Sequence, residues 1–308
     1  MTDSKQRPPL SVIVPTCGRP DLLDAALSCL RESLAEGDEL VVVESGSAQP
    51  EPVWEVARRH GATLLVADVR GVSKARNLGW QQARHDQVAF IDDDIRVQPG
   101  WATAMAAGLA AHPQAAFVSG RIALPEGQGT LALTVKDDAD VQEFDRRSGG
   151  VIGHSANLGM HRAVLAAVGG FDEAMGPGSR WPAGEDPDLL DRVLATGAHG
   201  WYEPAAAAHH EHWRRVRQYV VLQHGYGIGS GARLAKLVRT DRLRFRVVLA
   251  DDVWRWGIAS VVRELFKRDW LRAAGSLLRV LGMVRGAATA MFVPVRDGHF
   301  RGRASSSS

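Results

Sequence analysis

Three consecutive carboxylates, Asp92, Asp93 and Asp94, stand directly after a short apolar run that ends at Ile91. Like charges in direct succession repel one another, so a cation is needed to neutralise them. Carboxylate oxygens suit a hard divalent cation such as Mg²⁺ or Mn²⁺, which commonly takes phosphate oxygens as further ligands. The segment indicates either a metal–phosphate site or, more simply, an acidic turn after a strand.

A second acidic group, Gly184-Glu185-Asp186-Pro187, opens a helical pattern that runs to Leu194. The dipole of a helix stabilises a charged carboxylate in the first turn. Such a carboxylate can take a proton from an attacking hydroxyl group. The alternative is that Asp186 only caps the helix, a task that Asp188 could also perform.

The elements that must position these groups alternate along the first ninety residues. Four apolar, β-rich runs before the acidic triplet are expected to be strands, at 10–14, 40–43, 62–66 and 87–91. Between them lie three segments with helical spacing, at 21–34, 53–60 and 73–84. Continuous apolar runs of this kind predict a parallel sheet with helices on both faces. Ligands bind beyond the carboxyl ends of such strands. Further along, we expect a loop at 126–150, a strand at 151–159, a helix at 161–168 and a strand at 201–208.

Several separate segments match one known family in the same order along the chain. They are Ser11-Val12-Ile13-Val14-Pro15-Thr16 with Arg19-Pro20, Val43-Glu44-Ser45-Gly46-Ser47, Gly71 through Ala75-Arg76-Asn77-Leu78-Gly79, the acidic triplet, Gly169-Gly170-Phe171-Asp172-Glu173 and Gly184-Glu185-Asp186. Together they resemble glycosyltransferase family 2, the inverting nucleotide-sugar transferases of the GT-A fold, over residues 10 to about 212. The resemblance implies a Rossmann-like, mostly parallel sheet with helices on both faces, in a catalytic domain of residues 1–212.

The resemblance assigns the donor site to residues that follow the first strands. Pro15, Thr16 and Arg19 would line the donor cleft, although an ordinary turn explains them nearly as well. Glu44 would accept a hydrogen bond from the nucleotide base, and Arg76 would lie near the base or the diphosphate. Glu44 and the following Ser45 depart from the two acids that are usual in the family, and this departure bears on base preference.

The metal site is also implied by the resemblance. Asp92 and Asp94 take the two positions of the DxD motif, with Asp94 as the main metal ligand and Asp92 or Asp93 facing ribose or metal-bound water. The cluster His209-His210-Glu211-His212 would add a ligand, for which His210 fits best. The expected cofactor is Mn²⁺ or Mg²⁺, which would offset the charge of the leaving diphosphate.

The acceptor side is assigned in the same way. Asp186 is the expected general base for inverting transfer. Glu185 would assist acceptor binding or orient the base. Trp181 could stack on an apolar sugar face, and a packed core tryptophan is the equal alternative.

The cysteine count, the apolar runs and a missing motif exclude several classes of protein. Two cysteines rule out a disulfide framework. Neither a signal-like apolar start nor a membrane-length apolar run is present, so we expect a cytoplasmic protein with at most peripheral contact at the inner membrane face. The Gln-x-x-Arg-Trp motif of the family's processive synthases is also missing, which predicts the transfer of single sugars.

The net charge of +2 hides an asymmetry along the chain. Residues 1–210 carry 18 basic and 28 acidic side chains, whereas residues 211–308 carry 19 basic and 7 acidic ones. The second part, 213–304, alternates apolar and basic residues in helical spacing, and 305–308 is expected to be a disordered tail. Its partner could be a lipid surface, a second subunit or the acidic flank of the catalytic domain; no nucleic-acid-reading motif is present.

The sequence as a whole predicts a metal-dependent inverting glycosyltransferase that uses a nucleotide-diphosphate sugar, UDP first, and a hydroxyl-bearing acceptor. A sugar nucleotidyltransferase would need a longer Gly-rich loop after the first strand. A phosphatase with an Asp-x-Asp nucleophile would need threonine or valine where Arg96 stands. A non-catalytic nucleotide-sugar binder would not need Asp186.

Overall fold

The computed structural model describes residues 7–112, 114–124, 135–211 and 216–301. The expected tail at 305–308, the first part of the expected loop at 126–150 and the predicted boundary after residue 212 lie outside the described residues.

One half of the central sheet is parallel, as predicted. Its strands are β1 (Leu10–Thr16), β2 (Glu39–Ser45), β3 (Thr63–Ala67) and β4 (Gln87–Ile91), in the order β3-β2-β1-β4. Each ends within two residues of the place expected from its apolar run. The carboxyl ends of β1 and β4 are therefore adjacent, which brings the loop after Thr16 next to the acidic triplet.

The other half of the sheet is mixed, a feature that the sequence did not predict. Its strands are β5 (Ile95–Val97), β6 (Ala115–Ala123), β7 (Gln142–Phe144), β8 (Asn157–His161) and β9 (His199–His210). Strand β8 lies between β4 and β6 and is antiparallel to both. No helix is present in the described part of the connection from β6 to β8, so β8 can return beside β6 in the opposite direction.

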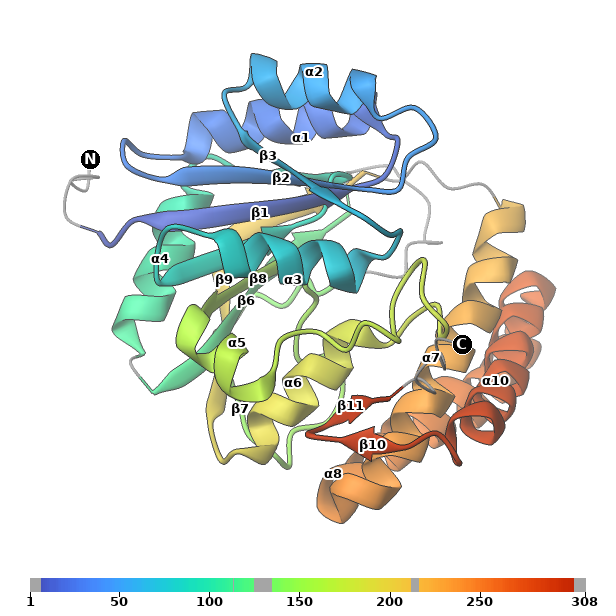
Figure 1. Ribbon diagram of the computed structural model, residues 1–308. Helices are drawn as coiled ribbons and strands as arrows, with labels where there is room; N and C mark the ends of the chain where they lie inside the picture. Colours follow the sequence, from blue (N-terminus) through green and yellow to red (C-terminus); the bar gives the residue numbers. More distant parts are fainter. Residues whose placement is uncertain (1–6, 113, 125–134, 212–215, 302–308) are drawn as a thin grey trace, which may run out of the picture.

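Helices cover both faces of the sheet, as Figure 1 shows for α1 and α2 on one side and α3 on the other. The bounds are α1 (Pro20–Ser33), α2 (Glu51–Arg59), α3 (Val72–Gln82), α4 (Trp101–Ala111), α5 (Arg162–Val168) and α6 (Glu185–Ala195). Alternation along β1 divides the core, because Val12 and Val14 pack with α1, α2 and α4 whereas Ile13 packs with α3, α5 and α6. The predicted α/β architecture with two covered faces is confirmed.

The carboxyl-terminal part is helical, as expected, and ends in a small hairpin. It contains α7 (Val216–Thr240), α8 (Arg242–Val248), the π-helix η1 (Leu249–Ile258), α9 (Ala259–Phe266), α10 (Trp270–Ala290), β10 (Val295–Arg296) and β11 (His299–Phe300). Among the described residues, none of these helices has the length and apolar character needed to cross a bilayer.

Helices α7 and α10 run side by side (Figure 1) and approach each other through glycines. A Cβ atom on Gly231 of α7 would lie 2.0 Å from the carbonyl oxygen of Met283, and one on Gly286 of α10 would lie 2.0 Å from that of Ile228. The two backbones are therefore in direct contact, and no side chain fits between them.

The substitution Gly286→Val is expected to lower the free energy of unfolding by about 1–3 kcal/mol, because the new side chain forces α7 and α10 apart. Thermal unfolding followed by circular dichroism measures the loss. The control is Ala288→Val, an exposed position on the same helix, which adds a β-branched side chain without the clash and, unlike the change from glycine, carries a helix-propensity cost. Equal melting temperatures for the two variants would contradict the close packing.

Buried ion pairs fasten the basic helices to the acidic catalytic part. Lys236 of α7 places Nζ 2.5 Å from Asp172 Oδ2 and 2.6 Å from Asp188 Oδ1. Asp191 of α6 receives Nε of Arg233 at 2.5 Å and Nε of Arg244 at 2.6 Å. Some of the opposite charges of the two parts thus neutralise each other, and the acidic flank of the catalytic part is one partner of the basic helices.

Candidate active site

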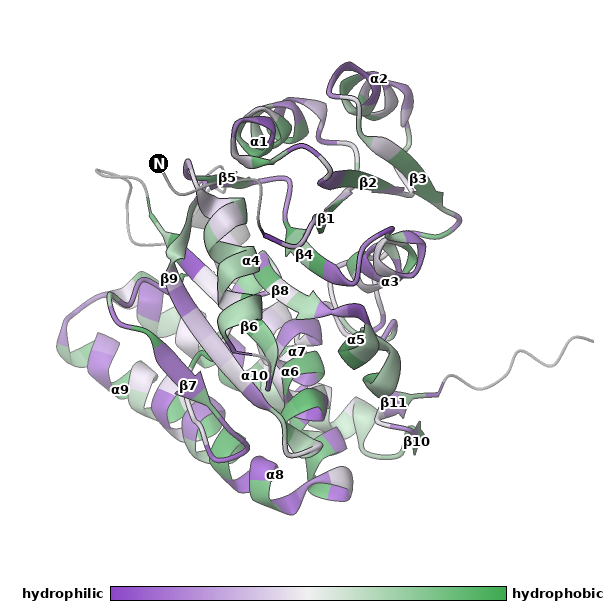
Figure 2. Ribbon diagram, turned by 90° about the vertical axis from the view of Figure 1, so that its left-hand side faces the viewer, coloured by the Kyte–Doolittle hydropathy of each residue, from purple (hydrophilic) through white to green (hydrophobic). Residues whose placement is uncertain are grey.

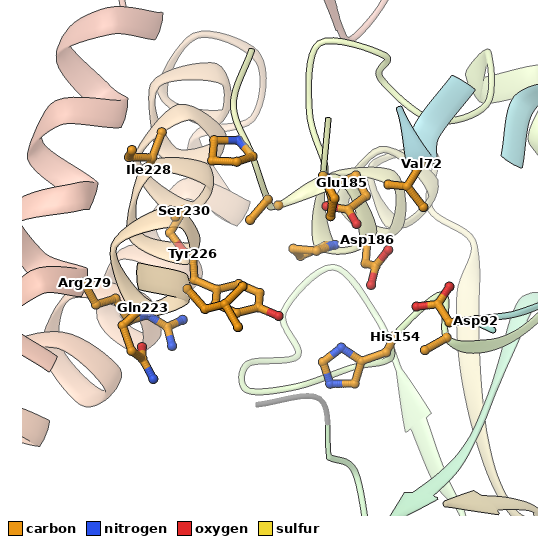
Figure 3. Close-up of a pocket in the computed structure, with 18 of the residues that line it drawn as sticks. Val72, Asp92, His154, Glu185, Asp186, Gln223, Tyr226, Ile228, Ser230 and Arg279 are labelled. Atoms are coloured by element: carbon orange, nitrogen blue, oxygen red, sulfur yellow. The ribbon is translucent and has the colours of Figure 1, made fainter. Parts of the chain in front are cut away.

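A cavity of about 1060 Å³ lies between the carboxyl ends of β1 and β4, the start of α6 and the inner side of the carboxyl-terminal helices. Figure 3 shows Asp92, His154, Glu185 and Asp186 on one side of it and Tyr226 on the other. Nine of the residues predicted from the sequence line it: Pro15, Thr16, Arg19, Arg76, Asp92, Asp94, Glu185, Asp186 and His210.

Arg76 joins the two acidic groups that were recognised separately in the sequence. It lies on the first turns of α3 and is buried, with Nη2 2.7 Å from Asp92 Oδ1 and Nη1 3.4 Å from both Glu185 Oε1 and Asp186 Oδ1. Burial opposes its charge, but the three carboxylates raise its pKa above the ordinary value. Arg76 therefore holds the end of β4 and the start of α6 at one place in the cavity.

Asp93 points away from the cavity and organises the loop after β1. Its carboxylate is fully buried, accepts a hydrogen bond of 2.7 Å from the Thr16 hydroxyl group and pairs with Arg19. Burial raises the pKa of Asp93 to about 7, against the opposing effect of Arg19. Asp92 and Asp94 line the cavity, whereas the turn between β4 and β5 directs the Asp93 carboxylate to Thr16 and Arg19.

Asp94 and His210 form the candidate metal site. The antiparallel pairing of β5 with β9 sets Ile95 opposite His210, so Nε2 of His210 lies 3.8 Å from Asp94 Oδ1. His210 Nδ1 is 3.1 Å from the Glu211 carbonyl oxygen, which leaves Nε2 toward Asp94. His209, the neighbour on the strand, does not line the cavity, and His212 lies outside the described residues.

The Asp94–His210 pair supplies two side-chain ligands of the kind that a divalent cation takes. A carboxylate oxygen with an imidazole nitrogen suits Mn²⁺. Nowhere in the described ranges do three His, Cys, Asp or Glu side chains converge as a metal-holding group. Asp92, the other expected ligand, pairs with Arg76. The pair therefore fits a cation that takes its remaining ligands from a bound molecule, such as the oxygens of a diphosphate.

Glu185 and Asp186 differ in environment although they are adjacent in the chain. Asp186 lines the cavity and accepts a hydrogen bond from the Ser155 hydroxyl group. Burial, together with the neighbouring Asp186, raises the pKa of Glu185 to about 8. A carboxyl group that keeps its proton at neutral pH cannot accept another one. Of the two, Asp186 is the group placed to act as a base.

The substitution Glu185→Gln is expected to raise the melting temperature by a few degrees at pH 8 and to leave it nearly unchanged at pH 5. The folded chain holds the proton up to about pH 8, whereas the unfolded chain releases it near 4.5, so the native residue costs stability as the pH rises between these values. Thermal unfolding from pH 5 to 8 measures the difference. The matched control is Glu55→Gln, at an exposed position of α2. Parallel curves of melting temperature against pH for native chain and variant would contradict the protonated state of Glu185.

Besides Asp93, two other predicted residues do not line the cavity, Glu44 and Trp181. Glu44 is buried at the end of β2, where its carboxylate accepts hydrogen bonds from the Ser47 backbone N–H, at 2.7 Å, and from the Ser47 hydroxyl group. It shapes the turn whose Ser45 does line the cavity. Trp181 is also buried; its ring centroid lies 4.2 Å from that of Phe300, and its Nε1 donates to Thr289 Oγ1 at 3.2 Å. The structure places Trp181 in the packing between the catalytic part and the terminal hairpin.

Several residues of the cavity wall come from parts of the chain that were not predicted to form the site. His154 and Ser155 lie in the cavity wall just before β8, in a segment that was expected to be strand throughout. Burial lowers the pKa of His154, and its buried Nε2 has no hydrogen-bond partner in the described protein. Gln223 and Tyr226 of α7 line the opposite wall. No local motif marks these residues, because only the packing of α7 brings the two walls together.

This chain is similar to glycosyltransferases in sequence. The family model for glycosyl transferase family 2 matches residues 11–168, about half of the chain. The pre-mycofactocin glycosyltransferase of Mycobacterium tuberculosis (strain ATCC 25618 / H37Rv) is 29% identical over 262 residues, which are 82% of this chain and 53% of that protein. The chain thus spans about half the length of that curated relative.

Two solved structures share the fold. A mannosyltransferase from Pyrobaculum calidifontis, in complex with GDP-Man and Mn²⁺, has a TM-score of 0.64 at 19% identity and covers 92% of this chain and 88% of its own. TarS of S. aureus has a TM-score of 0.54 at 16% identity, over 92% of this chain and 55% of its own. The order of motifs, the two-faced sheet and the matched family model agree, and this chain belongs to glycosyl transferase family 2.

Proposed function

We propose that this chain transfers a single sugar from a nucleoside diphosphate sugar to an acceptor hydroxyl group, with inversion at the anomeric carbon and with the help of a divalent cation. The observation that carries the proposal is the position of Asp186. Its carboxylate lies in the same cavity as the Asp94–His210 pair and is tied through Arg76 to Asp92. The cavity thus brings a base and a phosphate-binding end together.

The donor end of the cavity is built for negative charge. Asp94 and His210 would hold the cation, and Arg19 and Arg76 line the same wall. A bound Mn²⁺ or Mg²⁺ would neutralise the diphosphate as it leaves. Arg76 contacts the carboxyl groups of Asp92, Glu185 and Asp186, and a guanidinium group can turn its remaining N–H donors to phosphate oxygen. We propose UDP as the first donor nucleotide and GDP as the main alternative, because the P. calidifontis structure holds GDP-Man.

At the acceptor end, Asp186 would take the proton of the attacking hydroxyl group. The Ser155 hydroxyl group holds one oxygen of Asp186 and so fixes the direction of the other. The protonated Glu185 can donate a hydrogen bond from its acidic proton while its other oxygen accepts from Arg76, which suits an orienting role. His154, neutral and with an unpartnered Nε2, can hold a second hydroxyl group of the acceptor. Inversion follows if the attack comes from the side opposite the diphosphate.

The short connection between β1 and α1 argues against the main competing enzyme class, the sugar nucleotidyltransferases. A sugar nucleotidyltransferase would need a long Gly-rich loop after the first strand. Here β1 ends at Thr16 and α1 begins at Pro20, so only Cys17, Gly18 and Arg19 lie between them.

A thermal-shift screen tests the proposal. Nucleoside diphosphates and their sugars are added with Mn²⁺ or with EDTA, and a ligand that binds more tightly raises the melting temperature further at the same concentration. We expect one nucleotide class to stabilise the chain with Mn²⁺ and to lose most of its effect with EDTA. A screen in which no nucleotide stabilises the chain would contradict the proposal. For the acceptor, the name of the M. tuberculosis relative makes pre-mycofactocin the first compound to try.

A further inference from the structure

Large apolar side chains are exposed along the outer side of η1, α9 and α10. They include Phe266, 86% exposed, Trp270, 68% exposed, and Phe292, 91% exposed. We define the outer apolar face by these three residues and by Trp254, Ile258, Val262, Leu265, Leu277, Leu281 and Val284, each at least 43% exposed. Elsewhere on the described surface, exposed large apolar residues are fewer and scattered.

The outer apolar face is a stripe and not a chance scatter. On η1 and α9 the exposed residues 254, 258 and 262 recur every fourth position, and on α10 the residues 270, 277, 281 and 284 fall on one side of the helix. The opposite side of α10 carries Gly282 and Gly286, which contact α7. The contact of α10 with α7 therefore lies on the side of the helix away from the stripe, and an exposed apolar patch of this extent marks an interaction site.

The charges beside the stripe decide what it can contact. Arg255, Lys267, Arg268 and Arg285 are exposed on the same helices. The acids of this region are engaged within the fold. Asp251 accepts a hydrogen bond from the Gly150 backbone N–H, and Asp252 pairs with Arg233. Glu264 is buried. Asp269 caps α10 by accepting a hydrogen bond from the Arg272 backbone N–H. The surface around the stripe is consequently cationic.

We propose that the outer apolar face docks on an anionic lipid surface. Amphipathic helices with aromatic residues on one side and Lys or Arg beside them lie in the membrane interface in this way, with the apolar side chains among the acyl chains and the cations at the headgroups. A second protein would have to supply both a large apolar patch and a matching ring of acids. The inner sides of the same helices line the cavity through Trp256 of η1, Ser260 of α9 and Arg279 of α10. The acceptor side of the cavity would then stand close to the lipid.

Co-sedimentation of the full chain with vesicles tests the proposal without any nucleotide, so its outcome does not depend on the proposed function. Vesicles of phosphatidylcholine with about one-third phosphatidylglycerol are compared with pure phosphatidylcholine. We expect binding to the anionic vesicles that weakens with salt. The double variant Phe266→Ser/Trp270→Ser should lower the partition coefficient about 100-fold. Lys267→Glu/Arg285→Glu should lower it about 25-fold on anionic vesicles.

The control is Val66→Ser/Val141→Ser, which removes two side chains of 50% and 53% exposure that lie outside the stripe and should leave the partition coefficient unchanged. All four residues of the two apolar variants are exposed, so folding should persist, and circular dichroism checks it. Failure of the native chain to bind anionic vesicles would overturn the proposal, as would equal binding by the stripe and control variants. A dimer in analytical ultracentrifugation that Phe266→Ser/Trp270→Ser dissociates would also overturn it and would assign the stripe to a second copy of the chain.

Discussion

Replacing Asp186 by asparagine should lower kcat by about 10²–10⁴-fold while leaving donor affinity unchanged, because the amide cannot take the proton of the acceptor hydroxyl group. The substitution keeps the size of the side chain and its hydrogen bond with Ser155. It also leaves Arg76 paired with Asp92 at 2.7 Å, so the donor end of the cavity keeps its shape. The effect should therefore appear in kcat and not in the donor Kd.

Steady-state kinetics with the donor selected by the thermal-shift screen, together with calorimetric titration of that donor, separate the two quantities. Asp140→Asn, at an exposed position, makes the same chemical change away from the cavity and should behave as the native chain does. If Asp186→Asn retained the native kcat, Asp186 would not be the base. If the donor Kd rose with the loss of kcat, the residue would act in donor binding instead.

The second large effect is expected for Asp94→Ala, which should weaken Mn²⁺-dependent donor binding about 100-fold or more. Asp94 is the buried carboxylate that shares the candidate metal site with His210. Without it, one protein ligand is left, and a single imidazole holds a divalent cation poorly. Binding that does not depend on the cation should change little, since Arg19 and Arg76 remain.

Calorimetric titration of the nucleoside diphosphate with Mn²⁺ and with EDTA measures the change, and the melting temperature without ligand shows whether the variant is folded. Asp140→Ala serves as the control. An unchanged ratio of the affinities with and without Mn²⁺ would show that Asp94 does not hold the cation.

Much of the amino-terminal half could be predicted from the sequence because its signals are local. Apolar runs and helical spacing located the elements up to β4, and each boundary was within about two residues of the structure. The site residues that follow parallel strands, such as Thr16 and Asp94, could be predicted for the same reason, since parallel strands end at one edge of the sheet.

Other features depend on contacts between segments far apart in the chain, and no local pattern of residues predicts such contacts. Arg76 was expected near the base or the diphosphate of the donor, and no pattern in the sequence indicated the acidic groups 16 to 110 positions away that it contacts. Asp93 and Glu44 carry the charge expected of site residues but point into the protein, where neighbouring groups neutralise or bind them. The direction of Asp93 is set by the turn between β4 and β5, which a pattern of three acids does not define.

The partner of the basic carboxyl-terminal region could also not be predicted from the sequence. Composition predicted helices and an anionic partner but not which one. The structure shows that Arg233, Lys236 and Arg244 meet acids of the catalytic part, and that α7 and α10 supply a wall of the cavity. Among the described residues of η1, α9 and α10, the exposed cations and the outer apolar face are available to another surface.

The central claim is that one sugar leaves the nucleotide with inversion at the anomeric carbon. Water can act as a slow acceptor, so proton NMR of the native chain with the selected donor and Mn²⁺ tests this claim before the acceptor is known. For an α-linked donor we predict that the β-anomer of the free sugar appears first and that Asp186→Asn releases it far more slowly. First appearance of the α-anomer, or equal release by the variant, would contradict the claim.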